Sequence, residues 1–378
     1  MYQSSPGLFL GIRSPSQQKL ASIFAPRKGN EAPLWDLSVI NPHRASEFRS
    51  TAKSILSTNS KTVLVSQSGL TFASFSPNSQ LINRTPVRPI EQPVARETVT
   101  IEYHVKSIPG TVRGNPKPRK DVTIVDCEDS IHIFGVCDGH GLIGSEIAKY
   151  VAGKLPKRLR KLLSSASPSE GLFRSLFREV QESVRARFSL ASDSSGCRCV
   201  LVLIYKNSIW CANVGDCRAM VARRYPSVWI GLPLSQDHTP ARLFEVERIV
   251  KKGGKVEPMR NHLNEPIGIP LVWAEDPAVP GLTVTRSFGD FICHTVGVSV
   301  DPEVKCAPIL PEDRMIVLGS DGLWSVLDEQ EVADIVRRFT HLGVVRDCCT
   351  QVLENALSKW AGKGEAIDDI SVIVVLLK

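Results

Sequence analysis

The chain has 378 residues, a mass of 41.5 kDa, 42% apolar residues and a formal net charge of +7, a size that allows one large domain with a tail or two ordinary domains. The first 100 residues hold 11 Lys and Arg against 5 Asp and Glu, whereas residues 101–378 hold 35 against 34. A nearly neutral body lacks the concentrated basic face that nucleic acids need, so we expect no nucleic-acid partner. No apolar run approaches the roughly 18 to 20 residues that span a bilayer. We therefore expect a soluble protein without a transmembrane segment.

The cysteines indicate a reducing compartment. All ten follow residue 126, and none forms a Cys-x-x-Cys pair. Thiols scattered through apolar runs, such as Cys137 and Cys211, are typical of small core residues. The neighbouring pairs at 197/199 and 348/349 lack the spacing of a zinc site. We expect free thiols and a cytoplasmic or nuclear location.

The first 98 residues differ in composition and in hydrophobic periodicity from the rest of the chain. They are rich in Ser, Thr, Pro and Arg and show no sustained helical or strand periodicity. We predict a mostly disordered, low-complexity basic tail over residues 1–98 and a single domain over residues 99–378. The first thirty residues contain four basic residues and no acid, which weakly resembles an organellar transit peptide. The favoured alternative is a solvated tail, for which docking to acidic partners or to a membrane surface is a further hypothesis.

Strand and helix patterns begin near residue 99. Apolar residues from Phe173 to Phe188 recur at helical spacing and predict a helix that starts near Ser169. The other elements expected in this half are strands at 98–105, 122–125 and 131–137, a helix at 144–163, and strands at 199–205, 208–214 and 217–222.

The second half continues with grouped helices and strands. Asp328 with Glu331 three residues later has the pattern of a capping box that begins a helix reaching Phe339. Residues 255–281 are rich in Pro and Asn and predict an irregular flap. The remaining elements expected are a helix at 245–252, a strand at 314–319, a helix at 344–360 and a strand at 370–377. This grouping favours an α+β fold of antiparallel sheets over a doubly wound parallel sheet.

Acids recur where predicted strands begin or end. Asp138 and Asp321 each follow a strand and precede a glycine, Asp368 precedes the last strand, and Asp121 begins an early one. Any one of them alone is better explained as a turn residue or helix cap. Four acids on one rim would repel one another unless a cation neutralised them, and all-oxygen ligands suit Mg²⁺ or Mn²⁺. The set therefore predicts a metal site of the kind that acidifies water and clamps phosphate.

Six segments carry a resemblance to a known family. They are Phe134–Gly141, Ala212–Ala219, Leu234–His238, Gly281–Asp290, Gly319–Trp324 and Asp368–Val372. In sequence and in order they resemble the metal-dependent PPM (PP2C-type) protein serine/threonine phosphatases.

The resemblance implies a fold, a reaction and a set of site residues. The fold is a four-layer α-β-β-α sandwich of two antiparallel sheets flanked by helices. The reaction is hydrolysis of phosphoserine and phosphothreonine on phosphoprotein substrates by a water activated by two Mg²⁺ or Mn²⁺ ions. The implied metal ligands are Asp138, which bridges both ions, the Gly139 carbonyl, Asp321, Asp368, Asp121 and, at a weaker third site, Asp216. His140 matches the proposed general acid, which protonates the leaving oxygen.

Several positions depart from the family pattern. Lys120 precedes Asp121 where Glu or Gln is usual, and a +1 charge about 4 Å from a +2 ion costs on the order of 8 kcal/mol at an effective dielectric near 20. We therefore expect weakened binding of the second metal. The phosphate-binding arginine is displaced, and Arg113 or Arg119 is the candidate substitute.

Two further departures lie beside the expected site. Ser325 stands where the family commonly has Asp, which weakens the third metal site. Arg198 stands in a core strand where a small Thr is usual, and an unpaired guanidinium is costly to bury.

Two functions remain open. The favoured hypothesis is an active, monomeric serine/threonine phosphatase, because Asp138, Gly139, His140, Asp321 and Asp368 are all present. The alternative is a pseudophosphatase, a PPM-shaped binding or regulatory module with an impaired metal site.

Overall fold

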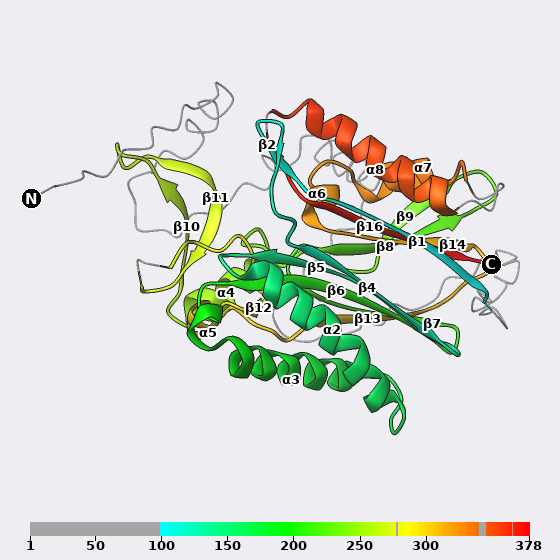
Figure 1. Ribbon diagram of the computed structural model, residues 1–378, viewed down its shortest axis with the longest axis horizontal. Coiled ribbons are helices and arrows are strands. Elements are labelled where there is room, and N and C mark those ends of the chain that lie inside the picture. Colours follow the sequence, from blue (N-terminus) through cyan, green and yellow to red (C-terminus); the bar gives the residue numbers. More distant parts are fainter. Residues whose placement is uncertain (1–98, 277–278, 340–344, 365) are drawn as a thin grey trace, which may run out of the picture. The chain divides into compact units, whose positions relative to one another are not determined.

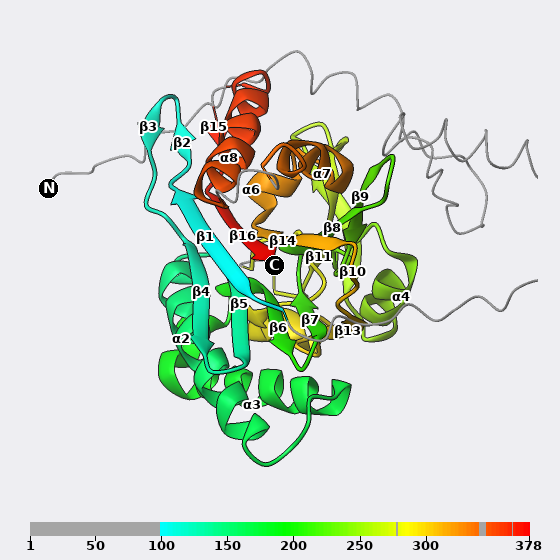
Figure 2. The same ribbon diagram turned by 90° about the vertical axis from the view of Figure 1, so that its right-hand side faces the viewer.

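Two antiparallel β-sheets lie face to face, and helices cover the outer face of each (Figures 1 and 2). The computed structural model describes residues 99–276, 279–339, 345–364 and 366–378, so the tail predicted for residues 1–98 lies outside the described residues. The α+β sandwich expected from the sequence is confirmed. Among the described helices, none combines the length and the apolar composition needed to cross a membrane.

One sheet has the strand order β1-β16-β14-β8-β9. These strands are β1 (Ile101–Ile108), β16 (Ile370–Leu377), β14 (Asp313–Gly319), β8 (Arg218–Arg224) and β9 (Trp229–Pro233). The strand β16 pairs with β1 over its whole length, from Ile370 opposite Ile108 to Leu377 opposite Ile101. Every residue of β16 is buried, which confirms the strand predicted there.

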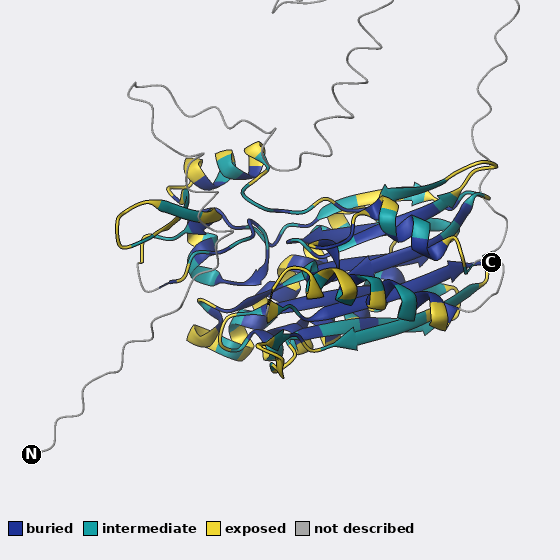
Figure 3. Ribbon diagram, turned by 90° about the horizontal axis from the view of Figure 1, so that it is seen from above, coloured by how far each residue is buried: buried dark blue, intermediate teal, exposed yellow. Residues whose placement is uncertain are grey.

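The other sheet has the order β13-β7-β6-β5-β4, with the short β12 paired to β6. Its strands are β13 (Glu303–Pro308), β7 (Ser208–Val214), β6 (Gly196–Tyr205), β5 (Ile131–His140), β4 (Asp121–Glu128) and β12 (Phe288–Gly289). Side chains alternate between its two faces. Phe134, Val136 and Val200 point between the sheets, whereas Ile133 and Leu201 point toward the helices. Both faces are therefore apolar, and Figure 3 shows the strands mostly buried.

Two long helices cover the second sheet, and two others cover the first. The helix α2 (Gly144–Leu163) packs on β4 to β6, and α3 (Glu170–Phe188) packs beside α2 and against β12 and β13. The helices α7 (Glu329–Val336) and α8 (Val345–Ala361) pack on the other sheet. The Ser169 side chain caps α3 by accepting from the Leu172 amide, and Asp328 and Glu331 form the predicted capping box. The helix α7 is shorter than predicted: it ends at Val336, whereas the sequence predicted an end at Phe339.

Strand β5 is longer than the sequence predicted. The expectation was that it would end at Cys137, with Asp138 and Gly139 in a corner beyond it. Instead the ladder with β6 continues to His140, which lies opposite Gly196. Asp138 is therefore a strand residue with fixed neighbours on both sides, Asp121 on β4 and Arg198 on β6.

The segment predicted to be an irregular flap contains a hairpin. Strands β10 (Lys255–Arg260) and β11 (Pro266–Trp273) pair antiparallel, with a register shift after Pro258. The prolines in this segment suggested a loop. In a two-stranded sheet, however, each strand has one edge without a partner, and a proline whose missing N–H would face that edge loses no hydrogen bond between strands. The other described elements are α4 (Leu243–Lys251), α5 (Phe291–Thr295), α6 (Asp321–Trp324), a 3₁₀ turn (Ser189–Ser192), β2 (Thr111–Val112), β3 (Asn115–Pro116) and β15 (Ala366–Ile367).

We predict that Phe177→Ala lowers the free energy of unfolding by about 3–5 kcal/mol. The Phe177 ring is fully buried under α3, with its centroid 5.1 Å from that of Phe288. Urea denaturation followed by circular dichroism measures the loss. The control Leu190→Ala, at a side chain that is 80% exposed, should change stability by no more than about 0.5 kcal/mol. Equal effects of the two substitutions would contradict the packing of α3.

Candidate functional site

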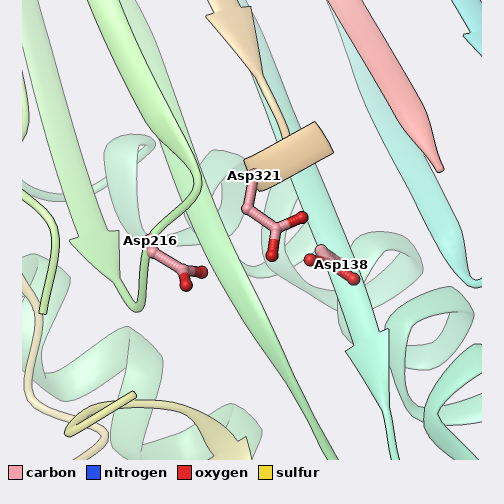
Figure 4. Close-up of side chains that lie close together, drawn as sticks. All are labelled: Asp138, Asp216 and Asp321. Carbon is pink, nitrogen blue, oxygen red and sulfur yellow. The ribbon is translucent and has the colours of Figure 1, made fainter. Parts of the chain in front are cut away.

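Three of the predicted metal-binding acids meet at one end of the sandwich (Figure 4). They are Asp138 on β5, Asp216 between β7 and β8, and Asp321 at the start of α6. One carboxylate oxygen from each lies within 4.8 Å of the other two. One acid comes from β5, one from the connection between the two sheets, and one from the start of α6, just after β14. The cluster therefore forms only when both sheets are in place. We refer to these three residues as the acid trio.

The strand register brings Arg198 to the acid trio. In β6 Arg198 lies directly opposite Asp138, and side chains of such a pair share one face of the sheet. That face is the one between the sheets, because Val136 and Val200, two residues away from them, belong to the inter-sheet core. Arg198 therefore points between the two sheets. Its neighbours on the same face contribute apolar side chains to the inter-sheet core, and Arg198 lies at the end of that core, beside the acid trio.

The Arg198 guanidinium binds all three acids. Its Nη1 donates to Asp138 Oδ2 at 2.6 Å and also to Asp321 Oδ2, and its Nε lies 3.2 Å from Asp216 Oδ1. Its Nη2 donates to Thr283 Oγ1 at 3.4 Å. Only 12% of the Arg198 side chain is exposed. The sequence suggested an unpaired and costly buried cation; the structure corrects this, because the guanidinium has three ion-pair partners.

Burial and charge act in opposite directions on these groups. Burial lowers the pKa of Arg198, but the carboxylates of Asp138, Asp216 and Asp321 outweigh it and raise that pKa well above its usual value. Burial raises the pKa of Asp138 well above its usual range, against the opposing charge of Arg198. It likewise raises the pKa of Asp216 to about 7. The guanidinium is therefore charged at any physiological pH.

The other two predicted metal ligands among the acids lie outside the acid trio. Asp121 faces Asp138 from β4 and is 2% exposed, and burial raises its pKa to about 7. Asp368 accepts a hydrogen bond from Lys117 Nζ at 2.5 Å. Burial lowers the pKa of Lys117, but its hydrogen bond and attraction to Asp368 raise it overall. The sequence reasoning missed Lys117, which lies in no motif.

His140 and Lys120 lie at the end of β5, His140 as its last residue and Lys120 by a side-chain hydrogen bond to the next residue, Gly141. His140 Nε2 is 2.7 Å from Asp290 Oδ2, and Ser287 Oγ donates to the same carboxylate oxygen at 2.5 Å. Lys120 Nζ donates to the carbonyl oxygen of Gly141 at 3.0 Å. Asp290 belongs to the segment Gly281–Asp290 that carries the family resemblance, but the sequence analysis assigned it no role, and its pairing with His140 joins residues 150 positions apart.

Gly139 is required sterically as well as for the carbonyl role that the resemblance implies. A Cβ atom at Gly139 would lie 2.3 Å from the carbonyl oxygen of Gly144, at the start of α2. The glycine therefore allows β5 and α2 to approach closely, and its proposed part in metal binding stays a prediction.

The two arginines proposed to bind phosphate are on the surface. Arg113 lies in the turn between β2 and β3, and Arg119 is exposed, with its Nη1 3.5 Å from the carbonyl oxygen of Ser107. A cavity of about 230 Å³ opens beside the acid trio and is lined by His140, Arg198, Thr283 and Asp290, but by neither of these arginines. Their phosphate-binding role stays a prediction.

The described arrangement does not fit a divalent cation within the acid trio. Carboxylate oxygens are the ligands that Mg²⁺ prefers, but it needs them at about 2.0–2.1 Å from one central point. Arg198 Nη1 occupies the space between Asp138 and Asp321, at hydrogen-bond distance from both. The donor set is thus suitable in chemistry, and a side chain fills the place where the ion would lie.

We predict that Asp369→Ala destabilises the rim by about 2–3 kcal/mol, because its carboxylate accepts from the backbone amides of Gly110 at 2.7 Å and Lys120 at 2.6 Å. Hydrogen exchange at the Lys120 amide should accelerate in parallel. Asp369→Asn, which keeps one acceptor oxygen, is the control and should lose less stability. Unchanged exchange in the alanine variant would contradict the role of Asp369 as the anchor of this segment.

Comparisons with known proteins agree with this geometry. The family model for protein phosphatase 2C matches residues 106–363. "Probable protein phosphatase 2C 35" of Arabidopsis thaliana is 29% identical over 295 residues, covering 73% of this chain and 84% of that protein. "Probable protein phosphatase 2C 48" of Oryza sativa subsp. japonica is 30% identical over 291 residues, covering 69% and 80%.

A solved structure supports the same fold. The crystal structure of a serine-threonine phosphatase 2C from Toxoplasma gondii superposes with a TM-score of 0.62 and 22% identity, covering 76% of this chain and 97% of that one. A sex-determining protein of C. elegans superposes with a TM-score of 0.59 and 23% identity, covering 73% and 64%. These two likenesses support the fold alone. The family model, which matches more than half of the sequence, leads to one conclusion: the chain belongs to the protein phosphatase 2C family.

Proposed function

We propose that this member of the family is a pseudophosphatase, a PP2C-fold binding or regulatory module that does not hydrolyse phosphoproteins by the metal-dependent route. One observation carries the proposal: the Arg198 guanidinium lies among Asp138, Asp216 and Asp321. The sequence alone favoured an active phosphatase, because the acids are intact. The position of Arg198 favours the alternative.

The electrostatic cost of adding a metal supports this proposal. A divalent ion about 4 Å from a guanidinium is repelled by on the order of 8 kcal/mol at an effective dielectric near 20. Arg198 cannot avoid this cost by losing its proton, because the acids raise its pKa further above a value that is already high. Moving the side chain away would break its ion pairs with three largely buried carboxylates, whose side chains are 12%, 14% and 23% exposed. Each route opposes metal binding.

A second cation adds to the effect at the neighbouring acids. Lys117 pairs with Asp368 and lies 3.8 Å from Asp369 Oδ1. This pair is partly exposed, with 35% of the Lys117 side chain and 43% of the Asp368 side chain accessible, so it is worth no more than about 1 kcal/mol. An ion could displace Lys117 far more easily than Arg198. The proposal therefore depends on Arg198.

The test is hydrolysis of a phosphothreonine peptide by the full chain with millimolar Mn²⁺ or Mg²⁺. We expect a rate equal to that of the matched variant Asp138→Asn, while an active protein phosphatase 2C assayed in parallel releases phosphate. Metal-dependent release by the unmodified chain that Asp138→Asn abolishes would overturn the proposal and restore the active enzyme.

A further inference from the structure

We infer that Arg198 is a resident cation that takes the structural place of a metal ion, and that it alone keeps the acid trio closed to divalent cations. The inference rests on the proposed function and assigns its cause to one side chain. It also assigns Arg198 a second role, which is to join the two sheets at this end of the sandwich.

The ion pairs of Arg198 support its proposed role in joining the two sheets. Asp138 belongs to the six-stranded sheet, and Asp321 begins α6, two residues after β14 of the five-stranded sheet ends at Gly319. Asp216 lies in the crossover from β7 to β8. A single guanidinium binds all three. Since guanidinium offers five N–H donors in a fixed plane, it can bridge several carboxylates as a bound ion would.

The backbone at Gly215 packs closely against the aliphatic carbons of the Arg198 side chain. Gly215 adopts a φ of +94°, and a Cβ atom there would lie 2.6 Å from Arg198 Cβ and 2.8 Å from Arg198 Cγ. The aliphatic part of Arg198 therefore passes against bare backbone one residue before Asp216. This packing fixes the direction of the guanidinium and keeps it among the acids.

Lys120, which the sequence identified as the obstacle to metal binding, does not contact the acid trio in this way. Its ammonium group donates to the Gly141 carbonyl, and its backbone amide to Asp369. Among the described residues, Arg198 is the cation with ion pairs to Asp138, Asp216 and Asp321. Replacing Lys120 should therefore leave the acid trio closed, whereas replacing Arg198 should open it.

The experiment measures Mn²⁺ binding by the electron paramagnetic resonance signal of free Mn²⁺, together with thermal unfolding in EDTA and in Mn²⁺. The variants are Arg198→Thr, Arg198→Thr with Asp321→Asn, and Lys120→Glu. We expect Arg198→Thr to bind one Mn²⁺ per chain more than the unmodified protein. The double variant and Lys120→Glu should show no such gain.

The unfolding midpoint provides an independent readout. In EDTA the midpoint of Arg198→Thr should fall, because three largely buried carboxylates lose their counter-charge. With Mn²⁺ at 100 times its dissociation constant it should rise by about 5 °C, while the unmodified protein stays unchanged. If Arg198→Thr does not fold, Arg198→Gln serves instead, since its amide fills part of the space without charge.

The outcomes separate this inference from the proposed function. Absence of extra Mn²⁺ binding and of thermal rescue in both Arg198 variants overturns the inference, and so does a gain by Lys120→Glu alone. Neither result touches the proposed function, which fails only if the unmodified chain hydrolyses the phosphopeptide. Extra binding in an Arg198 variant, lost again with Asp321→Asn, supports the inference.

Discussion

Buried carboxylates that share one small space repel one another, and the organisation of this rim depends on how that repulsion is offset. Here an arginine offsets it from within the fold: Arg198 binds Asp138, Asp216 and Asp321 together. A guanidinium supplies positive charge and directed hydrogen bonds, but it has no open coordination position at which a water could become a nucleophile. The rim can thus be stable while lacking the group on which metal-assisted hydrolysis depends.

The cations around the rim differ in how firmly they are held. The Lys117 side chain is 35% exposed and can move into solvent at little cost. Arg198 is instead packed between the sheets, with its aliphatic carbons against Gly215. Burial strengthens an ion pair only when every charged group has a partner, because an isolated buried charge is strongly destabilising. Arg198 and the three acids are consequently interdependent, and a change in any one of them affects the others.

The features predictable from the sequence were those that depend on local patterns. The bounds of α2, the start of α3 near Ser169 and the capping box of α7 follow from periodicity and from side chains three residues apart. The convergence of Asp138, Asp216 and Asp321 was also within reach through the family resemblance. The hairpin at 255–273 was not, because its prolines are tolerated only where strand edges are free.

The position of the Arg198 side chain could not be predicted from the sequence, for a different reason. It depends on the register between β5 and β6, which puts Arg198 opposite Asp138, and on β5 continuing past Cys137. A register error of one residue would turn the side chain toward α2 and α3 instead. The pairing of Lys117 with Asp368 likewise joins segments distant in the chain, and no local pattern connects them.

The position of β16 has a consequence for how the protein is made in the cell. It lies between β1 and β14, yet it is synthesised after every other described strand. Until it emerges from the ribosome, β1 lacks its neighbour and β14 exposes an unpaired edge in an apolar sheet. The nascent domain therefore passes through a state prone to edge-to-edge association, in which shielding by chaperones is most valuable.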